Sequence, residues 1–246
     1  MKILKLIQIK WLLRVIALSF LFCNYSCFTN MKSKEYIVNK IDIEHENSSY
    51  GLHHEVWDKA LLLKNFSYPW DALNTQKTNF KALYNKHHLF LRYMVNDTNI
   101  LIYNKSNDKM GVVNSDRVEI FFRKNSKLNE YYCLEVDSNG KAFDYKAKFY
   151  RKFDNDWSWP KGHLFTKGER VSEGYIVEIT ISLESLRNLG LLKNNLIEAG
   201  IYRADCIELA NDQQKESVFD WATWVNPETE IPDFHVPSSF GILKLK

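Results

Sequence analysis

The stretch Ser115-Asp116-Arg117-Val118-Glu119-Ile120-Phe121-Phe122 decides the fold class, because apolar and polar side chains alternate along it. Successive side chains of a β-strand point to opposite faces of the sheet, so alternate residues share a face. We therefore expect a strand with one face toward an apolar core and a second face that mixes charged and aromatic groups. The core face would carry Val118, Ile120 and Phe122, and the second face Arg117, Glu119 and Phe121.

The same alternation extends outward along the chain and predicts an all-β fold. Turn-like sequences separate the alternating segments, and no long helical pattern intervenes. Strands in this order are typical of an antiparallel, jelly-roll-like β-sandwich. One short helix is predicted within residues 183–192, capped by Ser182 and closed near Gly190. The other predicted strands are residues 80–84, 89–95, 131–136, 175–181 and 201–207, followed by a last short strand near residue 245.

The second face of the predicted sheet collects the groups that could bind a ligand. In residues 131–137 the alternation places Glu135 on this face, and in residues 175–181 it places Glu178 there. Arg92 lies similarly opposite its apolar neighbours in residues 89–95. Arginines, glutamates and aromatic rings are therefore expected to share one surface.

The first 27 residues have the features of an export signal. Basic residues precede an apolar run at 15–22, and Cys23 and Cys27 follow it. Lys10 and Arg14 interrupt the apolar stretch, whereas a membrane-spanning helix needs roughly 20 apolar residues. We expect a lipoprotein signal lipidated at Cys23 or Cys27, a cleaved secretory signal or a retained anchor. The protein is therefore predicted to be exported, either secreted or as a cell-envelope lipoprotein that is periplasmic or on the outer surface.

Residues 28–50 are polar without sustained periodicity and are predicted to form a tether. The domain would then occupy residues 51–246, with its packed sequence starting near Glu55.

The charge is nearly balanced, with 33 basic and 30 acidic residues, and no basic stripe suggests nucleic acid as a partner. A membrane would be a partner only through a lipid anchor, and the domain is expected to be a monomer.

Cys133 and Cys206 are the cysteines that remain after the predicted signal. An oxidising compartment would permit a disulfide between them. Because both fall inside predicted strands, two buried free thiols are an equally good interpretation.

Four pieces of the chain, in order, resemble the family 9 carbohydrate-binding modules. The resemblance covers roughly residues 55–246. It implies a β-sandwich that binds mono-, oligo- or polysaccharides without cleaving them, in association with breakdown of polysaccharides of the xylan or cellulose type. The sequence does not specify the sugar. The four pieces are Phe80-Lys81-Ala82-Leu83-Tyr84 with Leu89-Phe90-Leu91-Arg92, Ser115 to Phe122 as quoted above, Gly174-Tyr175-Ile176-Val177-Glu178-Ile179, and Pro237-Ser238-Ser239-Phe240-Gly241-Ile242-Leu243.

In the resembled family, two aromatic side chains and charged groups on the sheet face hold the sugar. The glutamate that bonds sugar hydroxyls matches Glu119, and a carboxylate suits this role because it accepts two hydroxyl protons in strong, charge-assisted bonds. We expect Arg92 and Arg203 to assist it. Alternatively, Glu119 pairs with Arg92, Arg117 or Arg203 on a solvated sheet face.

The sequence departs from the family pattern at the two stacking tryptophans. Val113 stands at one expected position and Phe234 at the other. Trp157 or Trp159 is predicted to replace the missing ring, with Phe234 and His235 on a proline-bounded loop as further contacts. Packing is the preferred role for Trp221 and Trp224.

An enzymatic role is the main alternative, because Glu119, Glu135 and Glu178 could form a carboxyl pair of a glycoside hydrolase that acts on O-glycosyl bonds. Neighbouring arginines are expected to hold their pKa values low, unlike that of a general acid, which favours a non-catalytic protein. A third alternative is an adhesion or structural sandwich that has lost sugar binding. It would be favoured if Phe234, Trp157 and Trp159 all proved buried.

No cofactor and no metal site are predicted. The adjacent pairs His53-His54 and His87-His88 point apart in extended backbone and do not suit a shared zinc ion. Members of the resembled family can hold structural calcium. Asp97, Asp108 and Asp116 could supply oxygen ligands here, although their spacing forms no regular loop motif.

Overall fold

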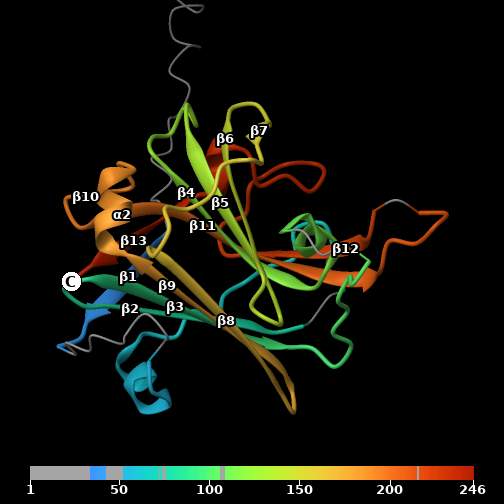
Figure 1. Cartoon of the computed structure of the whole chain (residues 1–246), viewed down its shortest axis with the longest axis horizontal. Coiled ribbons are helices and arrows are strands. Elements are labelled where there is room, and N and C mark those ends of the chain that lie inside the picture. The colour runs from blue at the N-terminus through green and yellow to red at the C-terminus, as the bar shows by residue number, and fades with distance from the viewer. Residues whose placement is uncertain (1–33, 43–51, 72, 74–75, 106–108, 215) are drawn as a thin grey trace, which may run out of the picture. The chain divides into compact units, whose positions relative to one another are not determined.

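The strands of the structure join into one sheet that curls into two layers (Figure 1). The computed structural model describes residues 34–42, 52–71, 73, 76–105, 109–214 and 216–246. The predicted export signal with Cys23 and Cys27, residues 28–33 and 43–50 of the predicted tether, and Asp108 lie outside the described residues.

The strands follow one another around the curled sheet in an order that differs from their order in the chain. One layer, called here the β4 layer, has the order β7-β6-β5-β4-β11-β13, and the other, the β3 layer, has the order β2-β3-β9-β8. Strands β10 and β12 pair with β11. The bounds are β1 Glu35–Lys40, β2 Thr78–Tyr84, β3 His88–Asn96, β4 Arg117–Arg123, β5 Tyr131–Asp137, β6 Ala142–Lys148, β7 Lys152–Asp154, β8 Leu164–Val171, β9 Gly174–Ser182, β10 Leu192–Lys193, β11 Leu196–Glu208, β12 Val218–Thr223 and β13 Gly241–Leu245.

Strand β1 corrects two predictions. It lies in the segment predicted to be a tether, and it pairs in parallel with β13 of the β4 layer and with β2 of the β3 layer. The sheet is therefore mixed rather than purely antiparallel, and the packed sequence starts well before Glu55. Only Tyr36 and Val38 of this strand are buried, and this alternation is too short to stand out from its polar surroundings.

The main core lies between the two layers. The core-facing residues of β4 and β5 pack with apolar side chains of β2, β3 and β9, as the alternation predicts. Tyr93 of β3 crosses this core and donates a hydrogen bond to the carbonyl of Glu119, with 2.8 Å between the two oxygens. Members of the core include Val118, Ile120, Phe122, Tyr132, Leu134, Val136, Phe80, Leu89, Leu91, Tyr175, Val177 and Ile179.

The second face of β4 and β5 is also buried, which the sequence analysis did not predict. Phe121 and Tyr131 pack there against Tyr202 of β11, and the segment before β13 covers them with Phe234 and Phe240. The face expected to mix charged and aromatic groups is therefore covered by the loop that precedes β13, and the alternative of a solvated face is wrong. The functional site described below lies beneath the edge of this loop.

The predicted short helix is confirmed as α2, Leu183–Asn188, with the Ser182 hydroxyl accepting the Ser185 N–H. Short 3-10 helices occur at η2 His54–Lys59, η3 Lys109–Asn114 and η4 Pro237–Ser239. Among the described residues, no helix has the length and apolar character needed to cross a membrane.

A tight turn joins β5 to β6 and depends on glycine. Gly140 has a φ of +85°, and an added Cβ atom would lie 2.5 Å from the backbone nitrogen of Gly168. Glycine is the residue that adopts such a conformation without strain.

The two cysteines, Cys133 and Cys206, are both buried free thiols, which decides between the two interpretations of the sequence.

Candidate functional site

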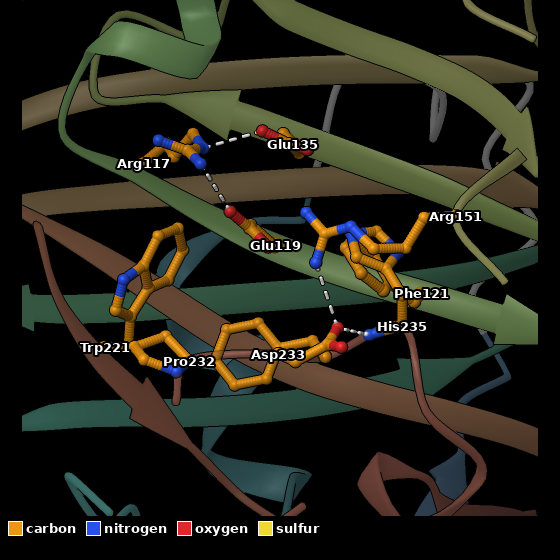
Figure 2. A pocket seen from close by; sticks show the side chains of 10 residues that line it. Arg117, Glu119, Phe121, Glu135, Arg151, Trp221, Pro232, Asp233 and His235 are labelled. Carbon is orange, nitrogen blue, oxygen red and sulfur yellow. Dashed lines mark hydrogen bonds and ion pairs between the residues drawn. The ribbon is translucent and has the colours of Figure 1, made fainter. Parts of the chain in front are cut away.

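A pocket with a volume of about 170 Å³ opens between the second face of β4 and β5 and the loop that precedes η4 (Figure 2). Charged groups line one side of it and aromatic rings the other. This combination is typical of sites that hold a small polar ligand with an apolar surface. The lining residues are Arg117, Glu119, Phe121, Glu135, Arg151, Trp221, Pro232, Asp233, Phe234 and His235.

Arg117 organises the charged side of the pocket. Its Nε lies 2.7 Å from Glu135 Oε2, and its Nη2 lies 2.9 Å from Glu119 Oε1. The two glutamates are directly opposite each other in the pairing of β4 with β5, so the strand register brings both to one guanidinium. The rings of Phe219 and Trp221 lie 4.7 Å and 5.4 Å from the guanidinium carbon, which adds cation-π stabilisation.

Glu119 and Glu135 differ in how completely their oxygens are bonded. Glu135 accepts hydrogen bonds from Arg117 and from the Tyr145 hydroxyl, the latter at 3.1 Å. The contact of Glu119 with Arg117 is an ion pair without the directional geometry of a hydrogen bond, and Glu119 Oε1 has no hydrogen-bond partner. Glu119 is thus the carboxyl group of the pair that is held by fewer directed hydrogen bonds.

Burial raises the pKa of Glu119 to about 8, and the charge of Glu135 raises it further while Arg117 opposes the shift. The prediction of a low pKa is therefore wrong for this residue, because its side chain is only 3 % exposed and faces a second carboxylate. Burial likewise raises the pKa of Glu178, against the effect of Arg92. A protonated Glu119 can donate a hydrogen bond as well as accept one.

Asp233 and His235 hold the loop at the rim of the pocket. Asp233 Oδ1 accepts the backbone N–H of His235 at 2.9 Å and pairs with Arg151 Nη1 at 3.2 Å, while its Oδ2 accepts the Tyr150 hydroxyl at 2.6 Å. The ring of His235 stacks on Phe121 with 5.2 Å between centroids. Burial, assisted by the charge of Arg151, lowers the pKa of His235 to about 4, so this imidazole is neutral at physiological pH.

Phe234 and Trp221 form the aromatic side. Phe234 lies parallel to Tyr202, with 4.0 Å between ring centroids, and is only 5 % exposed. Trp221 is half-buried and meets Phe234 nearly at right angles, 5.5 Å away. Of these two rings, Trp221 offers the larger free surface to a ligand.

Comparison of the sequence with known families identifies this architecture. Residues 51–246 match the profile of the family described as "Carbohydrate family 9 binding domain-like". The chain belongs to this family. The resemblance seen in the four sequence pieces is therefore confirmed. Domains of this family are binding modules and are generally non-catalytic.

Solved structures similar to this family 9 domain share its fold at low sequence identity. A proposed carbohydrate-binding protein of Bacteroides uniformis is 16 % identical with a TM-score of 0.65, over 87 % of this chain and all of the other. A family 9 module of Caldicellulosiruptor kristjanssonii in complex with glucose is 18 % identical with a TM-score of 0.53, over 87 % of this chain and 96 % of that one. The same kind of module in complex with cellotriose has a TM-score of 0.54 at 18 % identity, over 87 % and 94 % of the two chains. No curated protein matches the sequence.

Three of the seven predicted site residues line the pocket of this family 9 domain: Glu119, Phe234 and His235. Arg92 lies elsewhere, paired with Glu178 at 3.6 Å and placed 5.6 Å from the Trp57 ring on the outer face of the β3 layer. Arg203 is fully buried among aspartates. Neither arginine reaches the pocket, because each is neutralised within its own surroundings.

Trp157 and Trp159 also lie away from the pocket and pack on the core side of β5. The Trp157 ring lies 4.9 Å from that of Tyr132, and Trp159 donates from Nε1 to the Ser185 hydroxyl at 3.0 Å. Trp159 is buried, whereas Trp157 is half-buried. The expected replacement of the missing stacking ring by these tryptophans is therefore not what the structure shows.

The sequence analysis missed several lining residues. Alternation did place Arg117 and Glu135 on the correct face, but only the strand register brings them to Glu119. Trp221 was assigned to packing, and nothing in the sequence connects Arg151 with Asp233, which lies 82 residues further along the chain. Long-range pairing of this kind has no local signal.

A group of three aspartates is the one place among the described residues where acidic, histidine or cysteine ligand atoms gather closely enough for a metal ion. Asp97, Asp116 and Asp205 have carboxylate oxygens within 4.8 Å of one another. However, Arg203 Nη2 lies 2.8 Å from Asp97 and 2.9 Å from Asp205. The calcium that the family resemblance allows does not fit there, because the guanidinium fills the centre.

Proposed function

We propose that the pocket under the C-terminal loop binds a carbohydrate without cleaving it. The observation that carries this proposal is the meeting of Glu119 and Arg117 with the half-buried ring of Trp221 in one small pocket. The apolar face of a pyranose would lie on Trp221, and the sugar hydroxyls would bond to Glu119 and Arg117. The glucose and cellotriose complexes of similar modules support a sugar as the ligand.

The placement of the carboxyl groups favours binding over hydrolysis. Glycoside hydrolases place two carboxyl groups on either side of the glycosidic bond. Here Glu119 and Glu135 come from adjacent strands of the same sheet face, and Arg117 contacts both. A sugar in this pocket would meet both carboxyl groups from one side, so neither could act opposite the other.

The adhesion alternative gains only partial support. Phe234 and Trp159 are buried, but Trp157 is half-buried, and the pocket itself remains open.

The wider setting that we propose is an exported, monomeric module, attached to the cell envelope by a lipid or secreted, that takes part in breakdown of xylan- or cellulose-type polysaccharides. The export signal predicted from the sequence of residues 1–27 supports this setting.

Calorimetric titration of the mature protein with glucose-, xylose- and mannose-based mono- and oligosaccharides tests the proposal. We expect saturable binding that Trp221→Ala weakens by about 3- to 10-fold, since an aromatic contact contributes about 0.5–1.5 kcal/mol. Trp157→Ala is the matched control, a half-buried tryptophan outside the pocket whose loss should leave affinity unchanged. Equal affinity for the wild type and Trp221→Ala would remove the pocket from sugar binding, and release of shorter sugars would establish hydrolysis.

A further inference from the structure

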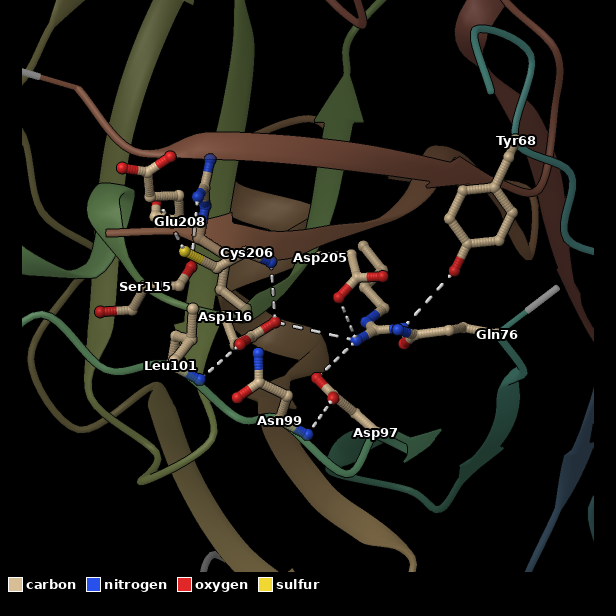
Figure 3. A network of polar contacts seen from close by, with 12 residues as sticks. Tyr68, Gln76, Asp97, Asn99, Leu101, Ser115, Asp116, Asp205, Cys206 and Glu208 are labelled. Carbon is tan, nitrogen blue, oxygen red and sulfur yellow. Dashed lines mark hydrogen bonds and ion pairs between the residues drawn. The ribbon is translucent and has the colours of Figure 1, made fainter. Parts of the chain in front are cut away.

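Asp97, Asp116 and Asp205 lie close together beside the start of β4 (Figure 3). Arg203 of β11 pairs with all three. Its Nη2 atom lies 2.8 Å from Asp97 Oδ2, 2.9 Å from Asp205 Oδ1 and 3.7 Å from Asp116 Oδ1. The side chains of Arg203 and Asp116 have no exposed surface. One guanidinium nitrogen therefore faces all three carboxylates in a buried site.

The aspartates are held in place from three parts of the chain. Asp97 follows β3 and accepts the Asn99 N–H at 2.8 Å. Asp116 precedes β4 and accepts the backbone N–H groups of Leu101 at 2.6 Å and Cys206 at 2.9 Å. These backbone contacts fix the carboxylates of Asp97 and Asp116 independently of the arginine, so two of the three carboxylates are preorganised for a positive charge.

The cluster needs a cation because its carboxylates repel one another. Burial raises the pKa of Asp116 to about 7, and the charge of Asp97 adds to the shift, whereas the two backbone hydrogen bonds and Arg203 oppose it. Burying like charges without compensation is costly. Two further polar atoms at the cluster, Arg203 Nε and Tyr175 Oη, are buried without hydrogen-bond partners. The hydrogen bonds of Arg203 to the carboxylates therefore come from Nη2, while Nη1 donates to the Gln76 amide oxygen.

We propose that Arg203 is the resident cation of this cluster and takes the place that a divalent metal ion such as Ca²⁺ would otherwise occupy. Calcium binds carboxylate, carbonyl and water oxygens at about 2.3–2.6 Å. A guanidinium nitrogen within hydrogen-bond distance of two of the three carboxylates leaves no room for such an ion. The folded state of this chain therefore needs no metal at this cluster.

The cluster also positions the pocket described above. Asp116 immediately precedes Arg117, and in the pairing of β4 with β11 Arg203 lies opposite Val118 and Ala204 opposite Arg117. An ion pair between Arg203 and Asp116 thus fixes the strand start that carries Arg117 and Glu119. A built-in cation performs this positioning whatever the calcium concentration outside the cell.

Calcium dependence of unfolding tests the proposal. The melting temperature of the wild type should be the same in millimolar CaCl₂ and in EDTA. Arg203→Ala should lower the melting temperature in EDTA by about 10 °C or more, because it leaves buried carboxylates without a partner. CaCl₂ should then restore part of the loss, since the vacated space admits an ion between the three carboxylates. Luminescence of Tb³⁺ sensitised by Tyr68, whose hydroxyl lies 3.4 Å from Arg203 Nη1, should appear in the variant and not in the wild type.

Two controls separate this effect from general metal binding. Arg123→Ala removes an arginine that pairs with Glu198 at the other end of β4 and should give no calcium response. Adding Asp97→Asn to Arg203→Ala should abolish the rescue by calcium. A wild-type melting temperature that rises with calcium and no longer does so in Asp97→Asn would overturn the proposal. An Arg203→Ala variant that calcium does not stabilise would overturn it too, because the arginine would then act through its shape and not its charge.

Discussion

Arg117 and Arg203 lie on adjacent strands in similar chemical surroundings, but Arg117 borders the pocket described above, whereas the Arg203 side chain is fully enclosed. Arg117 contacts two glutamates and Arg203 contacts three aspartates, and both guanidinium groups are buried. Both clusters contain buried polar atoms without a hydrogen-bond partner, Glu119 Oε1 beside Arg117 and Arg203 Nε with Tyr175 Oη in the other. The comparison teaches that buried charge becomes a binding site only where a pocket reaches it, as one does at Arg117 and Glu119.

The largest expected effect comes from removing the centre of the pocket. Arg117→Met should lower the free energy of unfolding by about 3–5 kcal/mol, because two buried glutamates lose their shared partner. Adding Glu135→Gln should recover part of this loss, since it removes the buried carboxylate that the substitution of Arg117 leaves without a cation. Urea unfolding measures both effects. A loss under about 1 kcal/mol would mean that Arg117 is solvated and that the contrast with Arg203 is wrong.

The second prediction concerns the pH dependence that Glu119 gives to stability. Its folded-state pKa of about 8 lies above its ordinary value of 4.5, so the folded protein holds this proton more tightly than the unfolded chain. The resulting stabilisation is complete below pH 4.5 and is lost as the pH rises toward 8, by up to about 1.4 kcal/mol per pH unit. Glu119→Gln should flatten this decline in urea unfolding between pH 5 and 8. An unchanged slope would assign the effect to another group.

His235 should produce the opposite slope at lower pH. Its folded-state pKa of about 4 lies below the ordinary value of 6.5, so the unfolded chain binds the proton more tightly. Stability is therefore lost as the pH falls from 6.5 toward 4. His235→Asn, which keeps an acceptor near the Tyr131 hydroxyl, should reduce this loss. If the variant and the wild type weaken equally between pH 6.5 and 4.5, the histidine is solvated in the folded protein.

The smallest expected effect is at the rim. Arg151 is 42 % exposed and pairs with Asp233 at 3.2 Å. Exposed ion pairs contribute about 0–1 kcal/mol, so Arg151→Ala should change the free energy of unfolding by less than about 1 kcal/mol. Calorimetric titration with the best sugar ligand would show whether affinity falls, as a direct contact requires. A large loss of stability instead would make the rim part of the structural core.

Strands with clear alternation could be predicted from local sequence, but β1, β6, β8 and β12 were not predicted, and the partners of the strands could not be. Residues 115–122 place Val118 in the core and Glu119 on the other face because side-chain alternation is a property of the backbone itself. The loop that covers that face was not predicted, because it is held by contacts between residues far apart in the chain. One example is the stacking of the Phe234 ring on the Tyr202 ring. The same limit explains why Arg203 was assigned to the sugar, since its aspartates come from three separate segments.

The aromatic assignments failed for a related reason. A tryptophan has the same appearance in a sequence whether it covers a core or meets a ligand, and Trp159 proved to be the former. Trp221 lines the pocket because β12 pairs with β11 in a register that brings Trp221 opposite Ala204. Trp159 is instead held on the core side by hydrogen bonds to Asp144 and Ser185, contacts that no local pattern reveals.

The short strand β1 joins the two layers through amides that are neighbours in the chain. The N–H of Lys40 donates to the Lys246 carbonyl after β13, and the N–H of Ile41 donates to the Tyr84 carbonyl at the end of β2. Such amide hydrogens exchange with deuterium only when their hydrogen bonds open. The exchange rates of these two residues therefore report separately on the two layers, and their order tells which layer comes away first when the domain begins to unfold.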